Sequence, residues 1–177
     1  MYYFGYGSNM LTTRLQARVP SARPVATAQL EAYELRFHKW SRDGSGKCNI
    51  VSVPDEEGTV HGVVFDVDSG ELDALDEAEQ RGRGYERREV VLDGPDAPRT
   101  AFAYVAQPAY VDDALLPYDW YHALVLAGAR QHDLPGAYIA QLEAVRSYPD
   151  PDEERRRTHR ALLQEAGYPL LTGGYSG

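Results

Sequence analysis

The chain opens on Tyr2–Met10, which reads YYFGYGSNM, and the expected fold is organised around this stretch. Four of its first five residues are aromatic, which indicates a short buried strand. Gly5 and Gly7 then permit a tight backbone turn, and Ser8 and Asn9 favour the start of a helix. The stretch therefore predicts a strand, a glycine turn and the first turn of a helix.

A junction of this kind leaves backbone N–H groups pointing toward one spot, where a helix dipole adds positive potential. Such a spot suits a carboxylate or a developing oxyanion. The competing interpretation is a strand that simply turns into a helix, and residues 2–10 alone do not decide between the two. The stretch lacks the third glycine of a dinucleotide-binding fingerprint, and Ser8 lacks the flanking glycine pattern of a nucleophile elbow.

Composition and charge limit the class of protein. The chain has 177 residues, of which 43% are hydrophobic, and this predicts one domain over residues 1–177 with a tail that is flexible from about residue 168. A net charge of −9 argues against nucleic acid and anionic membrane as partners. No apolar run reaches the length of a membrane span, and no secretory signal precedes the first strand. The single cysteine, Cys48, fits a reducing, cytoplasmic environment.

The first part of the chain predicts strands and the last part predicts helices. The expected strands cover residues 25–37, 48–53, 59–67, 85–92 and 99–105. The expected helices cover residues 70–80 and 118–131, a segment from Pro135 and a segment capped by Asp150. Because the strands are joined by short loops, we expect them to be largely antiparallel neighbours and the fold class to be α+β.

Glu79 is the most informative residue of the short helix expected over residues 70–80. At about 100° per residue, Glu79 falls between Leu72 and Leu75, which define an apolar stripe. Asp76 and Glu77 flank this stripe or face solvent. A carboxylate on a buried face is costly unless it is used or paired. The alternative is a fraying helix end from which Glu79 reaches water.

Other catalytic chemistry has weaker support in the sequence. The five histidines have no metal-ligand spacing, so no metal site is expected. Cys48 fits a buried strand position better than a nucleophile. Tyr85 and Tyr104 fall in expected strands, where a tyrosine is more often part of the core than of a catalytic site.

Several of these stretches together resemble the γ-glutamylcyclotransferase superfamily, which includes AIG2-like proteins. The resembling stretches are Tyr3–Met10, Val60–Phe65, Leu75–Glu79 with the following Tyr85, Ala103–Val105, and Gly128–Ala129 before Leu134–Pro135. The resemblance extends from the N-terminus to about Val145. The family commonly has glycine after the glutamate that corresponds to Glu79, whereas this chain has Gln80.

The resemblance implies a small mixed β-barrel flanked by α-helices, with a pocket at the N-terminal glycine turn. It implies that Glu79 is the catalytic residue. The implied substrate-binding residues are Tyr3, Phe4, Gly5, Tyr6, Gly7, Ser8, Asn9, Tyr85 and Tyr104.

The implied reaction cleaves the γ-glutamyl amide of an amino acid or of an amine. The α-amine of the substrate attacks its own γ-carbonyl, which releases 5-oxoproline and a free amine without a metal or another cofactor. The implied partner is therefore a small-molecule γ-glutamyl substrate, and a homodimer is left open. Two alternatives remain: a γ-glutamyl-amine cyclotransferase of a biosynthetic or salvage pathway, and a non-catalytic AIG2-like small-molecule-binding module.

Overall fold

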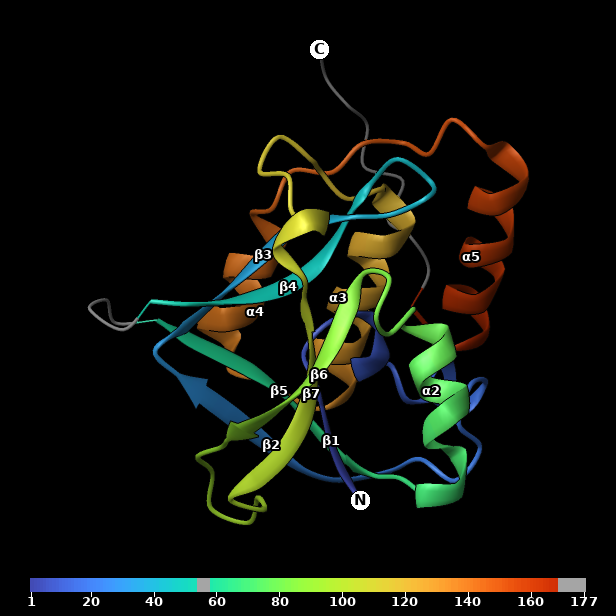
Figure 1. The fold of residues 1–177 in the computed structure, drawn as a ribbon. Helices are drawn as coiled ribbons and strands as arrows, with labels where there is room; N and C mark the ends of the chain where they lie inside the picture. Colours follow the sequence, from blue (N-terminus) through green and yellow to red (C-terminus); the bar gives the residue numbers. More distant parts are fainter. Residues whose placement is uncertain (54–57, 169–177) are drawn as a thin grey trace.

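The computed structural model describes residues 1–53 and 58–168, which form a mixed α+β fold (Figure 1). The main sheet has five strands in the order β2-β5-β1-β7-β6. These strands are β1 (Tyr2–Gly5), β2 (Arg23–Glu31), β5 (Thr59–Asp66), β6 (Tyr85–Val91) and β7 (Thr100–Ala106). A separate two-stranded sheet pairs β3 (Tyr33–Trp40) with β4 (Gly46–Ser52).

Strand β1 lies in the middle of the main sheet, which explains its aromatic sequence. It pairs antiparallel with β5 and parallel with β7, so that Tyr3 lies opposite Phe65 on one side and Phe102 on the other. Side chains alternate along a strand, so Tyr3 and Phe4 point to opposite faces of the sheet. Both faces are covered, since Tyr3 is 4% exposed and Phe4 is fully buried.

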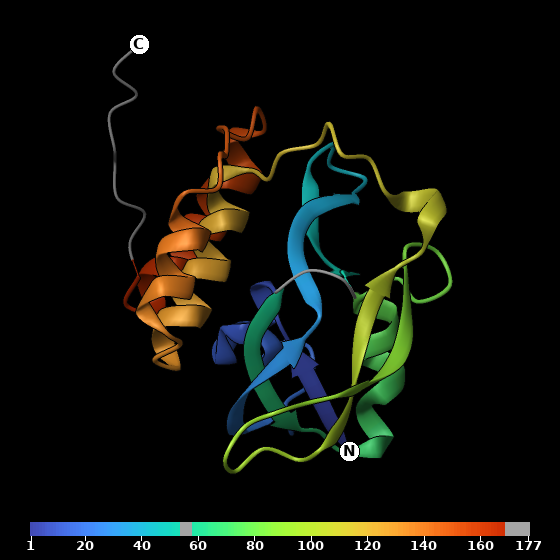
Figure 2. The ribbon, with the colours of Figure 1, turned by 90° about the vertical axis from the view of Figure 1, so that its left-hand side faces the viewer.

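The helices lie on both sides of the strands. The 3₁₀ turn η1 (Ser8–Met10) and the short helix α1 (Thr12–Gln16) follow β1, and the other elements are η2 (Ser69–Glu71), α2 (Leu72–Ala78), η3 (Pro108–Tyr110), α3 (Asp119–Gln131), α4 (Gly136–Glu143) and α5 (Glu153–Glu165). Figure 2 shows α3, α4 and α5 together on one side of the strands, with α2 on the other. Helix α3 packs directly on η1, because a Cβ atom at Gly128 would lie 2.5 Å from the backbone nitrogen of Leu11.

The predicted α+β class is confirmed, but the sheet is not closed into a barrel. Strands β2 and β6 are its edges, and the paired Gln29 and Asp93 form a single isolated bridge between the segments at those edges. The strand predicted over residues 25–37 is in fact two strands, β2 and β3. Ala32 separates them with a φ of +61°, and the alternation of apolar residues continues across this turn and conceals it.

The last helix begins later than predicted. Asp152, rather than Asp150, is its N-cap, and the Asp152 carboxylate accepts a hydrogen bond from the Arg155 backbone N–H. Asp150 is instead buried against Trp120. Most of the tail predicted from residue 168 lies outside the described residues. Among the helices that the structure describes, none is both long and apolar enough to span a bilayer.

Candidate active site

A small cavity lies where β1, η1 and the end of α2 meet, and its volume is about 30 Å³. Its lining residues are Tyr3, Tyr6, Gly7, Ser8, Asn9, Cys48, Glu79, Tyr85, Tyr104 and Tyr121. The structure thus brings together all the predicted site residues except Phe4 and Gly5.

Phe4 and Gly5 lie outside the cavity lining because of their positions in β1. The Phe4 side chain points to the face of the sheet opposite Tyr3 and packs against Gly62, where a Cβ atom would lie 2.7 Å from the Phe4 ring. A Cβ atom at Gly5 would lie 3.4 Å from the Phe65 ring. Both residues therefore support the strand beneath the cavity, and their direct binding of substrate stays a prediction.

The glycine turn is a single 3₁₀ turn and not the start of a long helix. The Met10 N–H donates to the Gly7 carbonyl at 3.0 Å, whereas the N–H groups of Gly7, Ser8 and Asn9 donate to no partner among the described residues. A Cβ atom at Gly7 would lie 3.0 Å from that of Cys48, so a larger residue would crowd the turn. A turn this short has only a small dipole, and its anion-binding capacity lies in these free N–H groups.

Glu79 follows α2 directly, and its N–H closes the last turn on the Leu75 carbonyl at 3.0 Å. Its side chain is 15% exposed, so the alternative of a frayed end reaching into water is wrong. The Oε1 atom accepts hydrogen bonds from Asn9 Nδ2 and Arg18 Nη1, each at 2.9 Å. The Oε2 atom accepts none from the described residues. One oxygen is therefore anchored, and the other is free to act on a bound molecule.

Tyrosine side chains make up much of the remaining wall. Burial is the main cause that raises the pKa values of these tyrosines, and nearby groups that include Glu79 add to it. The tyrosines are Tyr3, Tyr6, Tyr85, Tyr104 and Tyr121. These phenols are therefore neutral near pH 7 and serve as hydrogen-bonding groups rather than as bases. Two of them hold lining residues of the cavity together. The Tyr6 hydroxyl donates to the Tyr104 carbonyl, and the Tyr85 hydroxyl donates to the Cys48 carbonyl.

Asp76 flanks the apolar stripe and does not face solvent, which is the first of the two alternatives drawn from the helical wheel. Its side chain is 13% exposed. It accepts a hydrogen bond from the Tyr104 hydroxyl at 2.6 Å and forms ion pairs with Arg81 at 2.8 Å and Arg87 at 3.3 Å. Arg81 comes from the loop after α2 and Arg87 from β6, so the contacts between these elements bury the carboxylate and fix the orientation of Tyr104.

Cys48 and Tyr121 line the cavity although the sequence analysis did not assign them to the site. The Cys48 N–H donates to the Tyr121 hydroxyl at 3.1 Å. Burial raises the pKa of the Cys48 thiol to about 12, so the thiol stays protonated and is a poor nucleophile. Neither residue belongs to a local motif, and the helical spacing around Tyr121 indicates only a core position. Within the described residues, no group of three or more His, Cys, Asp or Glu side chains is placed to hold a metal ion.

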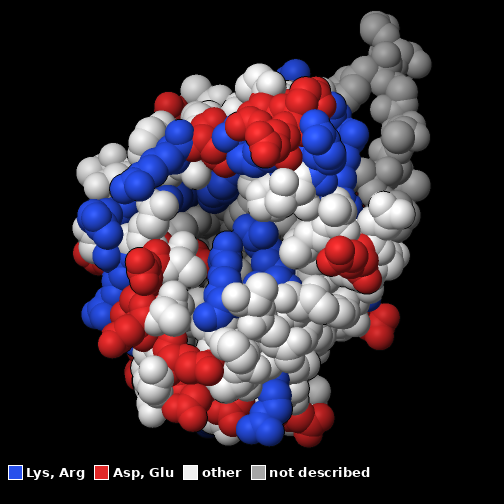
Figure 3. Space-filling model, turned by 90° about the vertical axis from the view of Figure 1, so that its right-hand side faces the viewer, with Lys and Arg blue, Asp and Glu red and all other residues white. Residues whose placement is uncertain are grey.

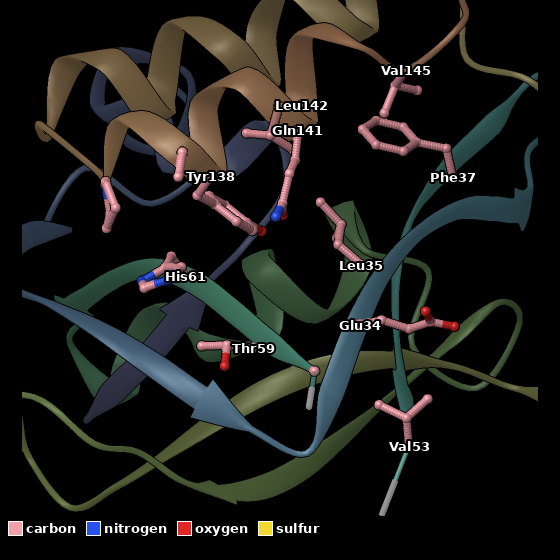
Figure 4. A pocket seen from close by; sticks show the side chains of 13 residues that line it. Glu34, Leu35, Phe37, Val53, Thr59, His61, Tyr138, Gln141, Leu142 and Val145 are labelled. Atoms are coloured by element: carbon pink, nitrogen blue, oxygen red, sulfur yellow. The ribbon is translucent and has the colours of Figure 1, made fainter. Parts of the chain in front are cut away.

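A second, larger cavity of about 570 Å³ lies between α4 and strands β3 and β5 (Figure 4). The His61 and Tyr138 rings, both in its lining, pack edge to face with centroids 4.9 Å apart. Leu35, Phe37 and Leu142 supply apolar lining. It shares no lining residue with the cavity at Glu79. The predicted site residues, apart from Phe4 and Gly5, therefore line the smaller of these two cavities.

Known proteins share both the sequence and the fold. Residues 3–123 match the family described as gamma-glutamyl cyclotransferase, AIG2-like. The chain is 30% identical over 149 residues to human gamma-glutamylcyclotransferase, a match that covers 81% of this chain and 77% of the human protein.

Solved structures agree with this match. One described as gamma-glutamyl cyclotransferase superposes with a TM-score of 0.78 at 27% identity, and it covers 90% of this chain and 98% of the other. A yeast cyclotransferase described as specific to glutathione shares the fold alone, with a TM-score of 0.58 at 13% identity over 80% of this chain and 93% of that one. The chain therefore belongs to the gamma-glutamyl cyclotransferase, AIG2-like family.

Proposed function

We propose that the protein is a γ-glutamylcyclotransferase that cleaves a γ-glutamyl amide and releases 5-oxoproline and a free amine. One observation carries the proposal. The Glu79 carboxylate lines the same cavity as the glycine turn, with Oε1 held by Asn9 and Arg18 and Oε2 without a hydrogen bond from the described residues. Family membership supports the reaction class, since the relatives carry this name.

The proposed reaction needs one proton carrier. The substrate's α-amine nitrogen forms a bond to its own γ-carbonyl carbon, and the bond from that carbon to the leaving nitrogen breaks. Glu79 Oε2 takes the proton that the attacking amine loses and returns it to the leaving nitrogen, so no proton is gained or lost overall. Because nucleophile and carbonyl belong to one molecule, the protein only has to hold the folded-back conformer.

The free N–H groups of Gly7, Ser8 and Asn9 suit the other requirement of this reaction. Attack on the γ-carbonyl places negative charge on its oxygen, and fixed backbone donors stabilise such an oxyanion without reorganising. The neutral tyrosines supply further hydrogen bonds and exclude water. No step calls for an electron acceptor or for an enzyme nucleophile, so the proposed reaction is independent of cofactors.

We expect a side-chain movement when substrate binds. A cavity of about 30 Å³ is too small for a γ-glutamyl group. Arg18 links Glu79 to Asn9 through Nη1, and its side chain is 27% exposed. We expect Arg18 to leave the Asn9 amide and turn toward the α-carboxylate of the substrate, while Glu79 Oε2 accepts the proton.

The proposal is tested by incubating the purified protein with a panel of γ-glutamyl dipeptides and γ-glutamyl amines and measuring 5-oxoproline. Release from at least one compound, at a rate proportional to protein concentration, is expected. The pairing of Glu79 with Arg18 also fits a binding module that never turns over, so binding of the same panel is measured by calorimetry. Tight binding without 5-oxoproline release would contradict the proposed enzyme and favour the binding module.

A further inference from the structure

The larger cavity, between α4 and strands β3 and β5, contains a buried hydroxyl group that the proposed reaction does not use. This hydroxyl belongs to Tyr138, which lies on α4 and is 6% exposed. Its oxygen atom is shielded from solvent and has no hydrogen-bond partner among the described residues. A phenol carries a donor proton, and a buried donor without an acceptor is costly. A bound molecule could supply the acceptor that this hydroxyl lacks.

The surroundings of Tyr138 keep its proton on the hydroxyl and do not accept it. Burial raises the pKa of Tyr138, so the phenol stays protonated near pH 7, and the backbone N–H of His61 acts against this shift. A backbone N–H is itself a donor and cannot take the phenol proton. The atom that would satisfy the Tyr138 hydroxyl is therefore an acceptor, such as a carbonyl oxygen.

Two more polar side chains of the lining, the Gln141 amide and the His61 ring, make no hydrogen bond with the described residues. Figure 4 shows the Gln141 amide and the Tyr138 hydroxyl directed toward the same part of the larger cavity. Burial lowers the pKa of His61, although the Glu31 carboxylate acts against this effect, so the ring is neutral near pH 7. A neutral imidazole has one donor and one acceptor nitrogen. The larger cavity thus offers hydrogen bonds from uncharged groups.

Apolar side chains form much of the remaining lining. Leu35 and Phe37 come from β3, and Leu142 and Val145 come from α4 and the chain just after it. Figure 4 places Phe37 and Val145 at one end of the cavity and His61 toward the other, so an aromatic molecule would meet a ring at each end. The volume of about 570 Å³ lies within the range of small-molecule sites, which is roughly 300–1,000 Å³.

The lining of the larger cavity offers no unpaired charge to an ionic ligand. Its described residues include no lysine or arginine, and its carboxylate, Glu34, pairs with Arg36. Figure 3 shows the opposite arrangement on the side where α2 and α5 lie, with lysine and arginine side chains gathered about a hollow. An ion would lose its hydration in the larger cavity without gaining a counter-ion. The ligand that fits this cavity is therefore uncharged.

We propose that the larger cavity is a second binding site, which takes an uncharged aromatic molecule that carries a carbonyl oxygen or a similar acceptor. The acceptor receives the proton of the Tyr138 hydroxyl, and the ring system packs between Leu35 and Leu142. The site is separate from the cavity at Glu79, with which it shares no lining residue. It goes beyond the proposed function, because no group of this cavity takes part in the proposed reaction.

The probe is coumarin, an uncharged bicyclic aromatic lactone with a single carbonyl group. Calorimetry with the full chain should show saturable binding with a Kd below about 1 mM. Two-dimensional NMR should locate coumarin through shifts of the methyl signals of Leu35, Leu142 and Val145. The anionic analogue coumarin-3-carboxylate should bind at least about 10-fold more weakly, because the lining offers it no counter-ion.

Tyr138→Phe removes the hydroxyl and keeps the ring. The variant should bind coumarin about 2- to 10-fold more weakly, because one hydrogen bond is lost. It should melt at or above the temperature of the parent, because it removes a buried donor without an acceptor among the described residues. The matched control is Tyr2→Phe, at an exposed tyrosine outside the cavity, which should keep the Kd and the melting temperature of the parent.

Four results would each overturn the proposal. The first is the absence of coumarin binding, and the second is equal binding of coumarin and its anionic analogue. The third is a set of methyl shifts confined to residues outside the larger cavity. The fourth is a folded Tyr138→Phe that binds coumarin like the parent. A lower melting temperature of Tyr138→Phe would also count against the proposal, because it would show that the hydroxyl stabilises the fold.

Discussion

Two buried ionic clusters in this molecule use the same kinds of side chain in opposite ways. At the start of α5, the Asp150 carboxylate is 0% exposed and accepts hydrogen bonds from Trp120 Nε1 at 2.7 Å and from Arg155 Nε and Nη2 at 2.6 Å each. The Asp152 N–H adds another at 2.9 Å. Near the cavity at Glu79, by contrast, the Glu79 Oε2 atom accepts no hydrogen bond, and the cations of Arg14 and Lys39 have no carboxylate partner, among the described residues.

The contrast distinguishes a cluster that stabilises the fold from one whose unpaired groups can bind a ligand. A buried carboxylate whose oxygens are all matched gains nothing from another molecule, and breaking its pairing leaves an uncompensated charge. A cluster with unmatched groups already carries that cost, and a ligand with the complementary charges removes it. Substitutions in the two clusters should therefore act on different quantities.

The largest expected effect is the loss of turnover in Glu79→Gln. The amide keeps the size of the side chain and removes its capacity to take a proton, which is worth about 100- to 10,000-fold in rate. We measure 5-oxoproline release and thermal melting, and we expect folded protein with little activity. Glu77→Gln changes an exposed carboxylate two residues away and serves as the matched control. A folded Glu79→Gln that turns over like the parent would make Glu79 structural.

The converse is expected of Asp150→Asn, which should lower stability and spare activity. The change leaves the Arg155 guanidinium without its counter-ion and replaces one accepting oxygen by an NH2 group that faces other donors, and breaking a buried ion pair costs roughly 3–5 kcal/mol. Urea unfolding should show this loss of unfolding free energy, whereas the folded protein should keep its kcat. Asp96→Asn, in an exposed loop, should change neither. A large loss of kcat at unchanged stability would place Asp150 in the catalytic machinery.

A smaller effect on activity is expected from the Asp76–Tyr104 contact, which orients one wall of the cavity. Tyr104→Phe and Asp76→Asn should each lower kcat/KM about 10-fold, as expected for a hydrogen bond to a charged group. Asp76→Asn also removes the charge that pairs with Arg81 and Arg87, so the double variant should be little worse than Asp76→Asn alone. Tyr2→Phe, at an exposed tyrosine, controls for loss of a hydroxyl. Fully additive losses would show that the two residues act independently.

Acid should weaken the α5 region through His159, whose ring stacks on Trp120 with centroids 3.7 Å apart. Burial, helped by the nearby Arg14, lowers the pKa of His159 from an ordinary 6.5 to about 4. A group whose pKa is lowered by folding stabilises the folded protein above its unfolded pKa, and this contribution disappears as pH falls through the folded value. The melting temperature should therefore fall between about pH 6.5 and pH 4. His159→Gln should flatten that fall, and an equally steep fall in the variant would assign it to other groups.

The smallest effect is expected at Gln80, which has a φ of +53° directly after Glu79. A left-handed backbone favours glycine, so Gln80→Gly should raise the free energy of unfolding by about 0.5–1 kcal/mol. The matched control is Asp133→Gly, at a φ of +50°, where aspartate already tolerates this conformation and the gain should be smaller. Chemical denaturation measures both. Destabilisation by Gln80→Gly would mean that the Gln80 side chain supports the loop.

Much of the site could be predicted from the sequence because its signals are local. The aromatic strand, the glycine turn and the place of Glu79 relative to Leu72 and Leu75 depend on residues a few positions apart, which backbone geometry relates directly. Local periodicity could not show that β2 ends at Glu31, because the pattern of apolar residues continues through the turn at Ala32 into β3.

Tertiary structure alone decided how the charges are paired. Asn9 and Glu79 lie 70 residues apart in the chain and meet within 2.9 Å, and the helical wheel could not show that two arginines from other elements bury Asp76. The helical wheel also could not show that both oxygens of Asp150 have hydrogen-bond donors, whereas Lys39 has no carboxylate partner among the described residues. The physical reason is that periodicity reports which face of an element is buried, whereas the free energy of a buried charge depends on which distant groups the fold places beside it.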